Sequence, residues 1–175
     1  MNKQLIGLIV AVTAVSPATA ALPVGAKAPD FATTGAVGGK PFKLHLAQQL
    51  RQGTVVLYFF PKAFTSGCTA EAHAFSESIR DFKKAGARVI GMSADDLPTL
   101  KKFSVEECRS AFPVATATPA TQKDYDVAWA EHPGLTTRTS YVIGRNGRIA
   151  FVHSDLDWSK HVSQTLAAVR ALKKK

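Results

Sequence analysis

Cys68 is the residue of this sequence best placed for chemistry. It follows the apolar run TVVLYFF at 54–60, whose β-branched and aromatic residues predict a strand buried on both faces. With Ala72 and Phe75 it also starts an apolar stripe at helical spacing, which predicts a helix with the cysteine in its first turn. Ligands bind at the carboxyl ends of parallel strands, and the amino end of a helix favours a thiolate over a thiol. Cys68 is therefore a candidate nucleophile; the alternative is a small cysteine buried on an apolar helix face.

Cys108 is the second of two cysteines. It ends the segment FSVEEC at 103–108, in a predicted helix that Asp96 can cap. The two could form a structural disulfide, or a reactive thiol and its partner, and composition does not decide between these. If that helix starts at the end of the sheet where Cys68 lies, Cys108 is about 18 Å beyond the start of the helix, at 1.5 Å per residue. A disulfide requires Cα atoms within about 7 Å, so a bridge would require one or both helix ends to unfold.

The periodicity of the rest of the chain predicts one α/β domain. Beyond 54–60, strands are expected at 88–93, 113–117, 139–143 and 148–153, with Asn146–Gly147 as a hairpin signal. Helices are expected to follow Cys68, to start after Asp96, to cover 119–128 and to start after Ser159 as N-cap. Residues 24–50 are expected to be extended segments joined by a turn. This alternation of strands and helices predicts a mixed sheet flanked by helices.

The residues around Cys68 carry a resemblance to a known family. Pro61, Thr65 and Cys68 form P-x-x-x-T-x-x-C, which resembles the active-site loop of peroxiredoxins, thiol peroxidases of thioredoxin-like fold. The longer run PKAFTSGCTAEAHAF at 61–75 is similar to the bacterioferritin-comigratory, or peroxiredoxin Q, subfamily. APDF near the start, VIGMSADD at 89–96 and TRTSYVIGRNGRI at 137–149 fall in the family's order. The resemblance extends from about Val24 to the C-terminus.

The resemblance implies a role for each matching residue. Cys68 resembles the peroxidatic cysteine, Thr65 the threonine that hydrogen-bonds thiolate and peroxide, and Pro61 the proline that shields the site from water. Arg138 resembles the active-site arginine, and a permanent cation there would favour the thiolate and stabilise charge on the leaving oxygen. From its position alone, Arg138 would be a surface arginine at the start of a strand. Glu71 matches a subfamily position, where we expect a first-turn glutamate that favours the helix dipole.

The implied activity needs no metal or organic cofactor. Hydrogen peroxide or a small alkyl hydroperoxide would oxidise Cys68 to a sulfenic acid, and a thioredoxin-like protein would restore the thiol. Many relatives have a second cysteine five residues after the first, where this chain has His73. Cys108 is then the expected resolving residue, in an intramolecular disulfide of a monomer. The alternatives are a one-cysteine mechanism with an inert Cys108, and an intermolecular partner.

Two other functions fit the same fold. A thiol–disulfide oxidoreductase would generally carry C-x-x-C, whereas the third residue after Cys68 is Glu71. A copper-delivery protein would carry closely spaced cysteines with a histidine, and that pairing is absent from the sequence. His73 lies about 140° around the helix from Cys68, which disfavours a metal site made of the two.

The first 20 residues resemble a secretory signal peptide. A lysine near the start precedes an apolar run at 5–15, which is too short to span a membrane, and Ala18-Thr19-Ala20 is a cleavage signal. We therefore expect cleavage between Ala20 and Ala21, a domain over 21–175, export, and a periplasmic location without a stable membrane anchor. The net charge is +9, and the basic residues lie on helix faces that we expect to be exposed to solvent. No aromatic residues are interleaved with them, which disfavours nucleic-acid binding.

Overall fold

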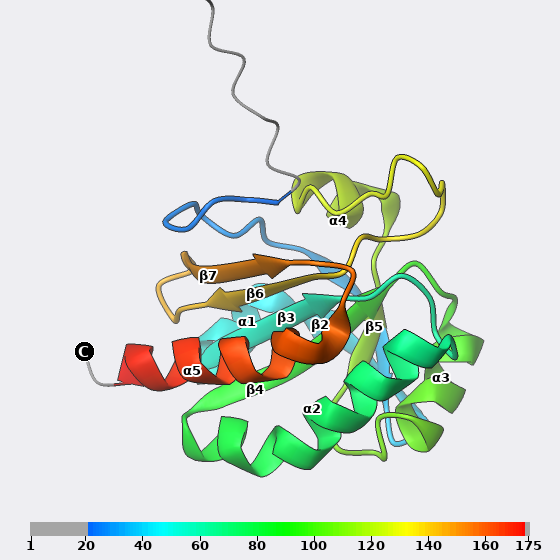
Figure 1. Ribbon diagram of the computed structural model, residues 1–175, viewed down its shortest axis with the longest axis horizontal. Coiled ribbons are helices and arrows are strands. Elements are labelled where there is room, and N and C mark those ends of the chain that lie inside the picture. The colour runs from blue at the N-terminus through cyan, green and yellow to red at the C-terminus, as the bar shows by residue number, and fades with distance from the viewer. Residues whose placement is uncertain (1–20, 174–175) are drawn as a thin grey trace, which may run out of the picture.

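The computed structural model describes residues 21–173, and the expected signal segment lies outside them. A mixed seven-stranded sheet has the order β2-β1-β5-β4-β3-β6-β7. Helices cover both of its faces (Figure 1). Within the described range, no helix combines the length and apolarity needed to cross a membrane. The strands are β1 (Ala32–Val37), β2 (Lys40–His45), β3 (Thr54–Phe59), β4 (Ala87–Ser93), β5 (Val114–Thr116), β6 (Thr139–Ile143) and β7 (Ile149–Ser154).

The sheet separates two hydrophobic cores. One core packs under α2 (Ser66–Lys84), α3 (Leu97–Glu106) and α5 (His161–Lys173), and includes Phe75 and Phe103. The other packs under α1 (Leu46–Gln52) and the segment that follows α4 (Pro119–Asp124), and includes Leu50 and Tyr125. The central strand β3 supplies both cores, because its side chains alternate between the two faces of the sheet. Val56 and Tyr58 belong to the first core, and Val55, Leu57 and Phe59 belong to the second. The prediction of a strand buried on both faces is therefore confirmed.

The parallel arrangement fixes where Cys68 lies. β3 pairs in parallel with β4, and β4 in parallel with β5, while β6 pairs antiparallel with β3. α2 follows β3 after a short loop, so the first turn of α2 lies at the carboxyl ends of the parallel strands. The predicted order of strands and helices from β3 onward is also confirmed.

Several local predictions were wrong. The helix α1 was not predicted, although Leu46 and Leu50 bury one face of it at a spacing of one turn. The last helix has no Ser159 cap: the Asp157 carboxylate instead accepts from the Ser159 N–H and caps a 3₁₀ turn, η1 (Trp158–Lys160), and α5 begins at His161. Aspartate and serine are equally good N-caps, so the sequence did not distinguish between these starts. α4 stops at Asp124, before the predicted end at 128.

Candidate active site

The loop between β3 and α2 is held in place by the end of β4. Asp95 accepts hydrogen bonds from the Ala63 N–H and from the Ser93 hydroxyl, both at 2.8 Å. Phe64, which follows Ala63 in the loop, has a left-handed backbone with φ of 64°, and this is unusual for a side chain of its size. Such backbone strain occurs where the surrounding contacts impose it. The loop therefore presents the start of α2 in one defined orientation.

Cys68 is the third residue of α2 and is almost completely buried, with 1% of its surface exposed. It is a free thiol in the structure. A guanidinium nitrogen of Arg138, Nη2, donates to Cys68 Sγ at 3.5 Å. The structure thus brings together two residues that are 70 positions apart in the sequence.

Arg138 immediately precedes β6 and is buried, with 5% of its surface exposed, so it is not a surface arginine. All three guanidinium nitrogens have a partner. Nη2 donates to Cys68, Nε donates to the Leu156 carbonyl at 2.9 Å, and Nη1 donates to a Glu71 carboxylate oxygen. This arrangement fixes the plane of the guanidinium group relative to the sulfur atom. Burial acts to lower the pKa of Arg138, whereas the negative charges that Glu71 and Cys68 can carry act to raise it. The net effect is a raised pKa, so the guanidinium stays charged.

Glu71 lies on α2, three residues after Cys68, and is fully buried. Its main contact is the hydrogen bond that it accepts from Arg138, and the first turn of α2 has no acidic residue, so the predicted role beside the helix dipole was wrong. Burial raises the pKa of Glu71 from 4.5 to about 8, against the opposing effect of the Arg138 charge. The second carboxylate oxygen, Oε1, is buried without a hydrogen-bond partner, which adds to the cost of the ionised form.

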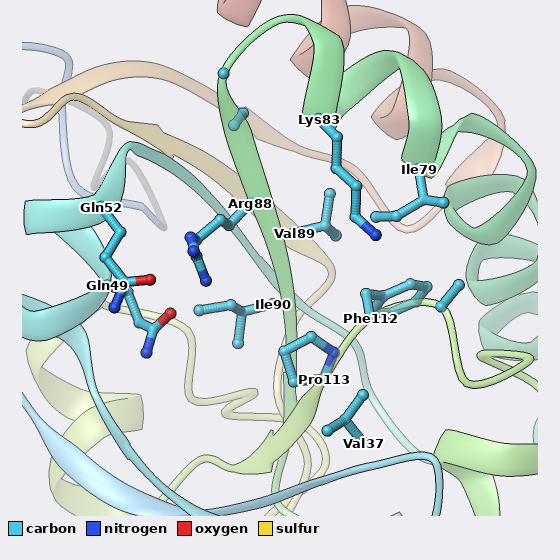
Figure 2. A pocket seen from close by; sticks show the side chains of 13 residues that line it. Val37, Gln49, Gln52, Ile79, Lys83, Arg88, Val89, Ile90, Phe112 and Pro113 are labelled. Atoms are coloured by element: carbon cyan, nitrogen blue, oxygen red, sulfur yellow. The ribbon is translucent and has the colours of Figure 1, made fainter.

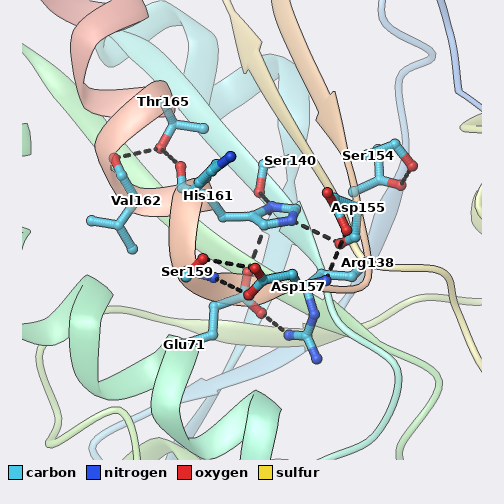
Figure 3. Close-up of polar contacts among 12 residues, drawn as sticks. Glu71, Arg138, Ser140, Ser154, Asp155, Asp157, Ser159, His161, Val162 and Thr165 are labelled. Carbon is cyan, nitrogen blue, oxygen red and sulfur yellow. Dashed lines mark hydrogen bonds and ion pairs between the residues drawn. The ribbon is translucent and has the colours of Figure 1, made fainter.

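His161 closes the far side of this cluster, as Figure 3 shows. Its Nε2 lies 2.9 Å from the Asp155 carbonyl, which only accepts, so Nε2 carries the proton. Its Nδ1 then accepts from the Ser140 hydroxyl at 2.8 Å and lies 3.7 Å from Glu71 Oε1. Burial lowers the pKa of His161 to about 4, so the ring is neutral at pH 7. The sequence had not pointed to His161, because its contacts join the start of α5 to α2 and β6.

Thr65 and Pro61 lie on the loop before Cys68. Thr65 is the N-cap residue of α2 by position, but its side chain makes no capping bond. Its hydroxyl is exposed and donates to the Lys62 carbonyl at 3.0 Å. Pro61 is half-buried at the start of the loop. Gly67 permits the approach of Arg138, because a Cβ atom there would lie 3.3 Å from Arg138 Nη2.

Cys108 lies two residues beyond the end of α3, in the same core as Cys68, and is fully buried. Its carbonyl accepts from the Ser76 hydroxyl at 2.9 Å. Ser76 is two turns along α2 from Cys68, about 12 Å at 1.5 Å per residue. Burial raises the pKa of the Cys108 thiol well above its ordinary value. The structure therefore keeps the two cysteines in one core without joining them.

His73 is not part of the Cys68 cluster. Its Nε2 lies 2.8 Å from a carboxylate oxygen of Glu107, next to Cys108. Among residues 21–173, no group of three or more histidine, cysteine, aspartate or glutamate side chains is arranged to hold a metal ion.

Comparisons with known proteins show the family of the chain. A model of the AhpC/TSA family matches residues 24–152. Chloroplastic peroxiredoxin Q of Arabidopsis thaliana is 35% identical over 148 residues, which cover 84% of this chain and 67% of the relative. Alkyl hydroperoxide reductase C of Helicobacter pylori is 32% identical over 83% of this chain and 77% of its own.

Solved structures lead to the same fold. Peroxidoxin BcpB of Mycobacterium tuberculosis has a TM-score of 0.76 and 28% identity over 85% of this chain and 97% of its own. AhpC of the same organism has a TM-score of 0.77 at 22% identity, over 87% of this chain and 94% of its own, and supports the thioredoxin-like fold alone. With a family match over most of its length, the chain belongs to the AhpC/TSA family as a peroxiredoxin of the Q subfamily, a thiol peroxidase that reduces peroxide with electrons from a thiol reductant.

Proposed function

We propose that Cys68 is the peroxidatic residue of this thiol peroxidase. The observation that supports it is the hydrogen bond from Arg138 to Cys68 Sγ, made by a guanidinium whose other nitrogens are held by Glu71 and Leu156. The Cys68 thiolate donates an electron pair to one peroxide oxygen. An S–O bond forms, the O–O bond breaks, and the second oxygen leaves as hydroxide or alkoxide and takes up a proton. The sulfur loses two electrons and becomes a sulfenic acid.

Arg138 is proposed to act on the charge that moves in this step. Its Nη2 hydrogen bond favours the thiolate, and the same cation stabilises the negative charge that develops on the leaving oxygen. The Thr65 hydroxyl already donates its hydrogen bond to the Lys62 backbone carbonyl, so its oxygen is available to accept a hydrogen bond from the peroxide O–H. Pro61 would limit the access of water to the same space. Glu71 is a positioning residue, because it reaches the reacting atoms through Arg138.

Cys108 is proposed to resolve the sulfenic acid. Its thiol would displace the sulfenic oxygen of Cys68, which forms a disulfide and releases one water molecule. A thioredoxin-like dithiol protein would then reduce the disulfide and be oxidised itself. The shared core and the position of Cys108 beyond the end of α3 support this route, which requires local unfolding. We also propose that the protein acts as a monomer.

The test combines three proteins: the natural sequence, Cys68→Ser and Cys108→Ser. Reduced protein is mixed with one equivalent of hydrogen peroxide, and free thiols, peroxide and sulfenic acid are measured. The natural sequence should lose both thiols, Cys108→Ser should consume one peroxide and stop at the sulfenic acid, and Cys68→Ser should consume none. Peroxide turnover by Cys68→Ser would refute the assignment. A dimer band in non-reducing electrophoresis would show that the disulfide joins two chains and is not intramolecular.

Export is a separate proposal. The signal-like residues 1–20 support cleavage between Ala20 and Ala21 and a periplasmic location. N-terminal sequencing of the protein recovered from its native host should begin at Ala21. An intact Met1 on exported protein would contradict the cleavage.

A further inference from the structure

The residues around Cys108 lie along one face of α2. Residues 107–110, called here the Cys108 segment, directly follow α3. Three α2 side chains contact three successive residues of this segment: the pairs are His73–Glu107, Ser76–Cys108 and Glu77–Arg109. Residues three and four positions apart share one face of a helix, so the three contacts form a single row.

The first two contacts are partly sheltered from solvent. His73 Nε2 lies 2.8 Å from a Glu107 carboxylate oxygen, and the two side chains are 35% and 20% exposed. The Ser76 hydroxyl lies 2.9 Å from the Cys108 carbonyl and equally close to a carbonyl of its own helix, and it can donate to either. The third pair is more exposed, and exposed ion pairs contribute little. His73 and Ser76 are therefore the α2 residues that chiefly hold the segment.

The backbone of the Cys108 segment is strained. Arg109 and Ser110 both have left-handed backbones, with φ of 49° and 55°. Glycine is the residue that most often ends a helix in this conformation, and a residue with a side chain adopts it at a cost in free energy. A conformation of this kind is kept only when neighbouring contacts enforce it. The contacts with α2 therefore oppose a release that the backbone favours.

The chain that follows the segment has a fixed point with free space beside it. Phe112 is buried, and its ring lies against Tyr58 and Phe75, with centroid distances of 6.0 and 6.2 Å. Beside Phe112, a cavity of about 450 Å³ is lined by Ile79 and Lys83 of α2 (Figure 2). The Cys108 segment can thus move about Phe112 once its contacts with α2 break.

We propose that His73 and Ser76 are positioning residues that hold Cys108 away from Cys68, and that release of their contacts sets the rate of disulfide formation. This role depends on the proposed resolving function of Cys108. Ser76 lies about 12 Å along α2 from Cys68, so the Cys108 segment must leave its place before the two sulfur atoms can meet. Until it does, the sulfenic acid of Cys68 can react with a second peroxide. The sulfur then gains a second oxygen, the O–O bond breaks, and water or an alcohol leaves.

The test compares two double variants with the natural sequence. One combines His73→Ala with Ser76→Ala. The matched control combines His45→Ala with Ser78→Ala, and His45 Nε2 lies 2.8 Å from Asp30 in an equivalent contact elsewhere in the protein. Reduced protein is mixed rapidly with one equivalent of hydrogen peroxide, and the disulfide is followed by acid quench and mass spectrometry.

The His73 and Ser76 variant should form the disulfide at least about threefold faster than the natural sequence, because two hydrogen bonds are lost. The control should match the natural sequence. The rate constant for peroxide consumption should be unchanged in both, since none of these side chains contacts Cys68 or Arg138, and this shows that each protein is folded. With excess peroxide, the faster variant should form correspondingly less sulfinic acid.

Two further measurements separate release of Cys108 from a general loosening of the fold. His73→Gln, whose amide can still donate to Glu107, should form the disulfide more slowly than His73→Ala. In a Cys68→Ser background Cys108 is the single thiol, and its reaction with DTNB should accelerate in the double variant by the same factor as disulfide formation.

An unchanged rate of disulfide formation, equal acceleration in the control, or faster reaction of Cys108 with DTNB without faster disulfide formation would each overturn the proposal. Absence of the disulfide in the natural sequence would instead refute the resolving function of Cys108, and the positioning role with it.

Discussion

The buried Glu71 carboxyl group makes the stability of the protein depend on pH in a defined window. The pKa of Glu71 is about 8 in the folded protein, against 4.5 as its ordinary value. Between these values the folded state holds a proton that the unfolded state has released, so the free energy of unfolding falls as the pH rises. The largest slope for one group is about 1.4 kcal/mol per pH unit.

His161 acts in the opposite direction over part of this range. Its pKa falls from 6.5 to about 4 on folding. Between pH 4 and 6.5 the unfolded state holds the extra proton, so this contribution to stability is complete above pH 6.5 and is lost as the pH falls. The two effects nearly cancel between pH 4.5 and 6.5. From pH 6.5 to 8 only Glu71 contributes, and stability should fall by about 2 kcal/mol.

Glu71→Gln tests this directly, because glutamine has nearly the same shape and cannot ionise. Urea unfolding of the reduced protein is measured from pH 5.5 to 8.5, and the difference in the free energy of unfolding between natural sequence and variant is plotted. This difference cancels the other groups that titrate in the range. Between pH 6.5 and 8, the free energy of unfolding of the natural sequence should fall by about 2 kcal/mol relative to that of the variant. Glu77→Gln, an exposed glutamate of the same helix, should give a flat difference. A flat difference for Glu71→Gln would refute the reasoning.

Three further variants test the proposed site. Arg138→Met should lower the second-order rate constant with peroxide by at least about a hundredfold, measured by stopped-flow mixing; an unchanged rate constant would show that Arg138 does not act on the reacting atoms. Cys108→Ser should lose turnover with a thioredoxin-type donor and be driven to the sulfinic acid by excess peroxide, detected by mass spectrometry; full turnover would assign a one-cysteine mechanism. Gly67→Val should reduce the peroxide rate constant by displacing Arg138, since the added side chain would start 3.3 Å from Nη2; an unchanged rate constant would show that this approach is not needed.

The sequence predicted those parts of the structure that depend on local pattern. β3, Cys68 at the start of α2 and the Asp96 cap of α3 follow from periodicity and from single capping residues. Arg138 required the resemblance to a family, because an arginine before a strand has no local sign of burial. The burial of Glu71 depends on α5 and β6, which lie far along the chain, and a glutamate in the same position of an exposed helix would have the same neighbours in sequence. His161 was missed for the same reason.

The contacts around the two cysteines indicate which end opens first when a disulfide forms. The first turn of α2 has no acidic residue, and its N-cap residue Thr65 makes no side-chain cap. The Cys108 segment has three contacts with its surroundings: the Cys108 N–H donates to the Phe103 carbonyl, the Cys108 carbonyl accepts from the Ser76 hydroxyl, and Glu107 lies 2.8 Å from His73. Oxidation of Cys68 also adds an oxygen to the sulfur atom that accepts the hydrogen bond from Arg138 Nη2, which disturbs that contact. We therefore expect the first turn of α2 to unwind before the end of α3, and hydrogen exchange at 65–72 to increase in the sulfenic acid form before it increases at 102–110. Faster exchange at 102–110 first would reverse this order and would show that the Cys108 segment moves toward an intact helix.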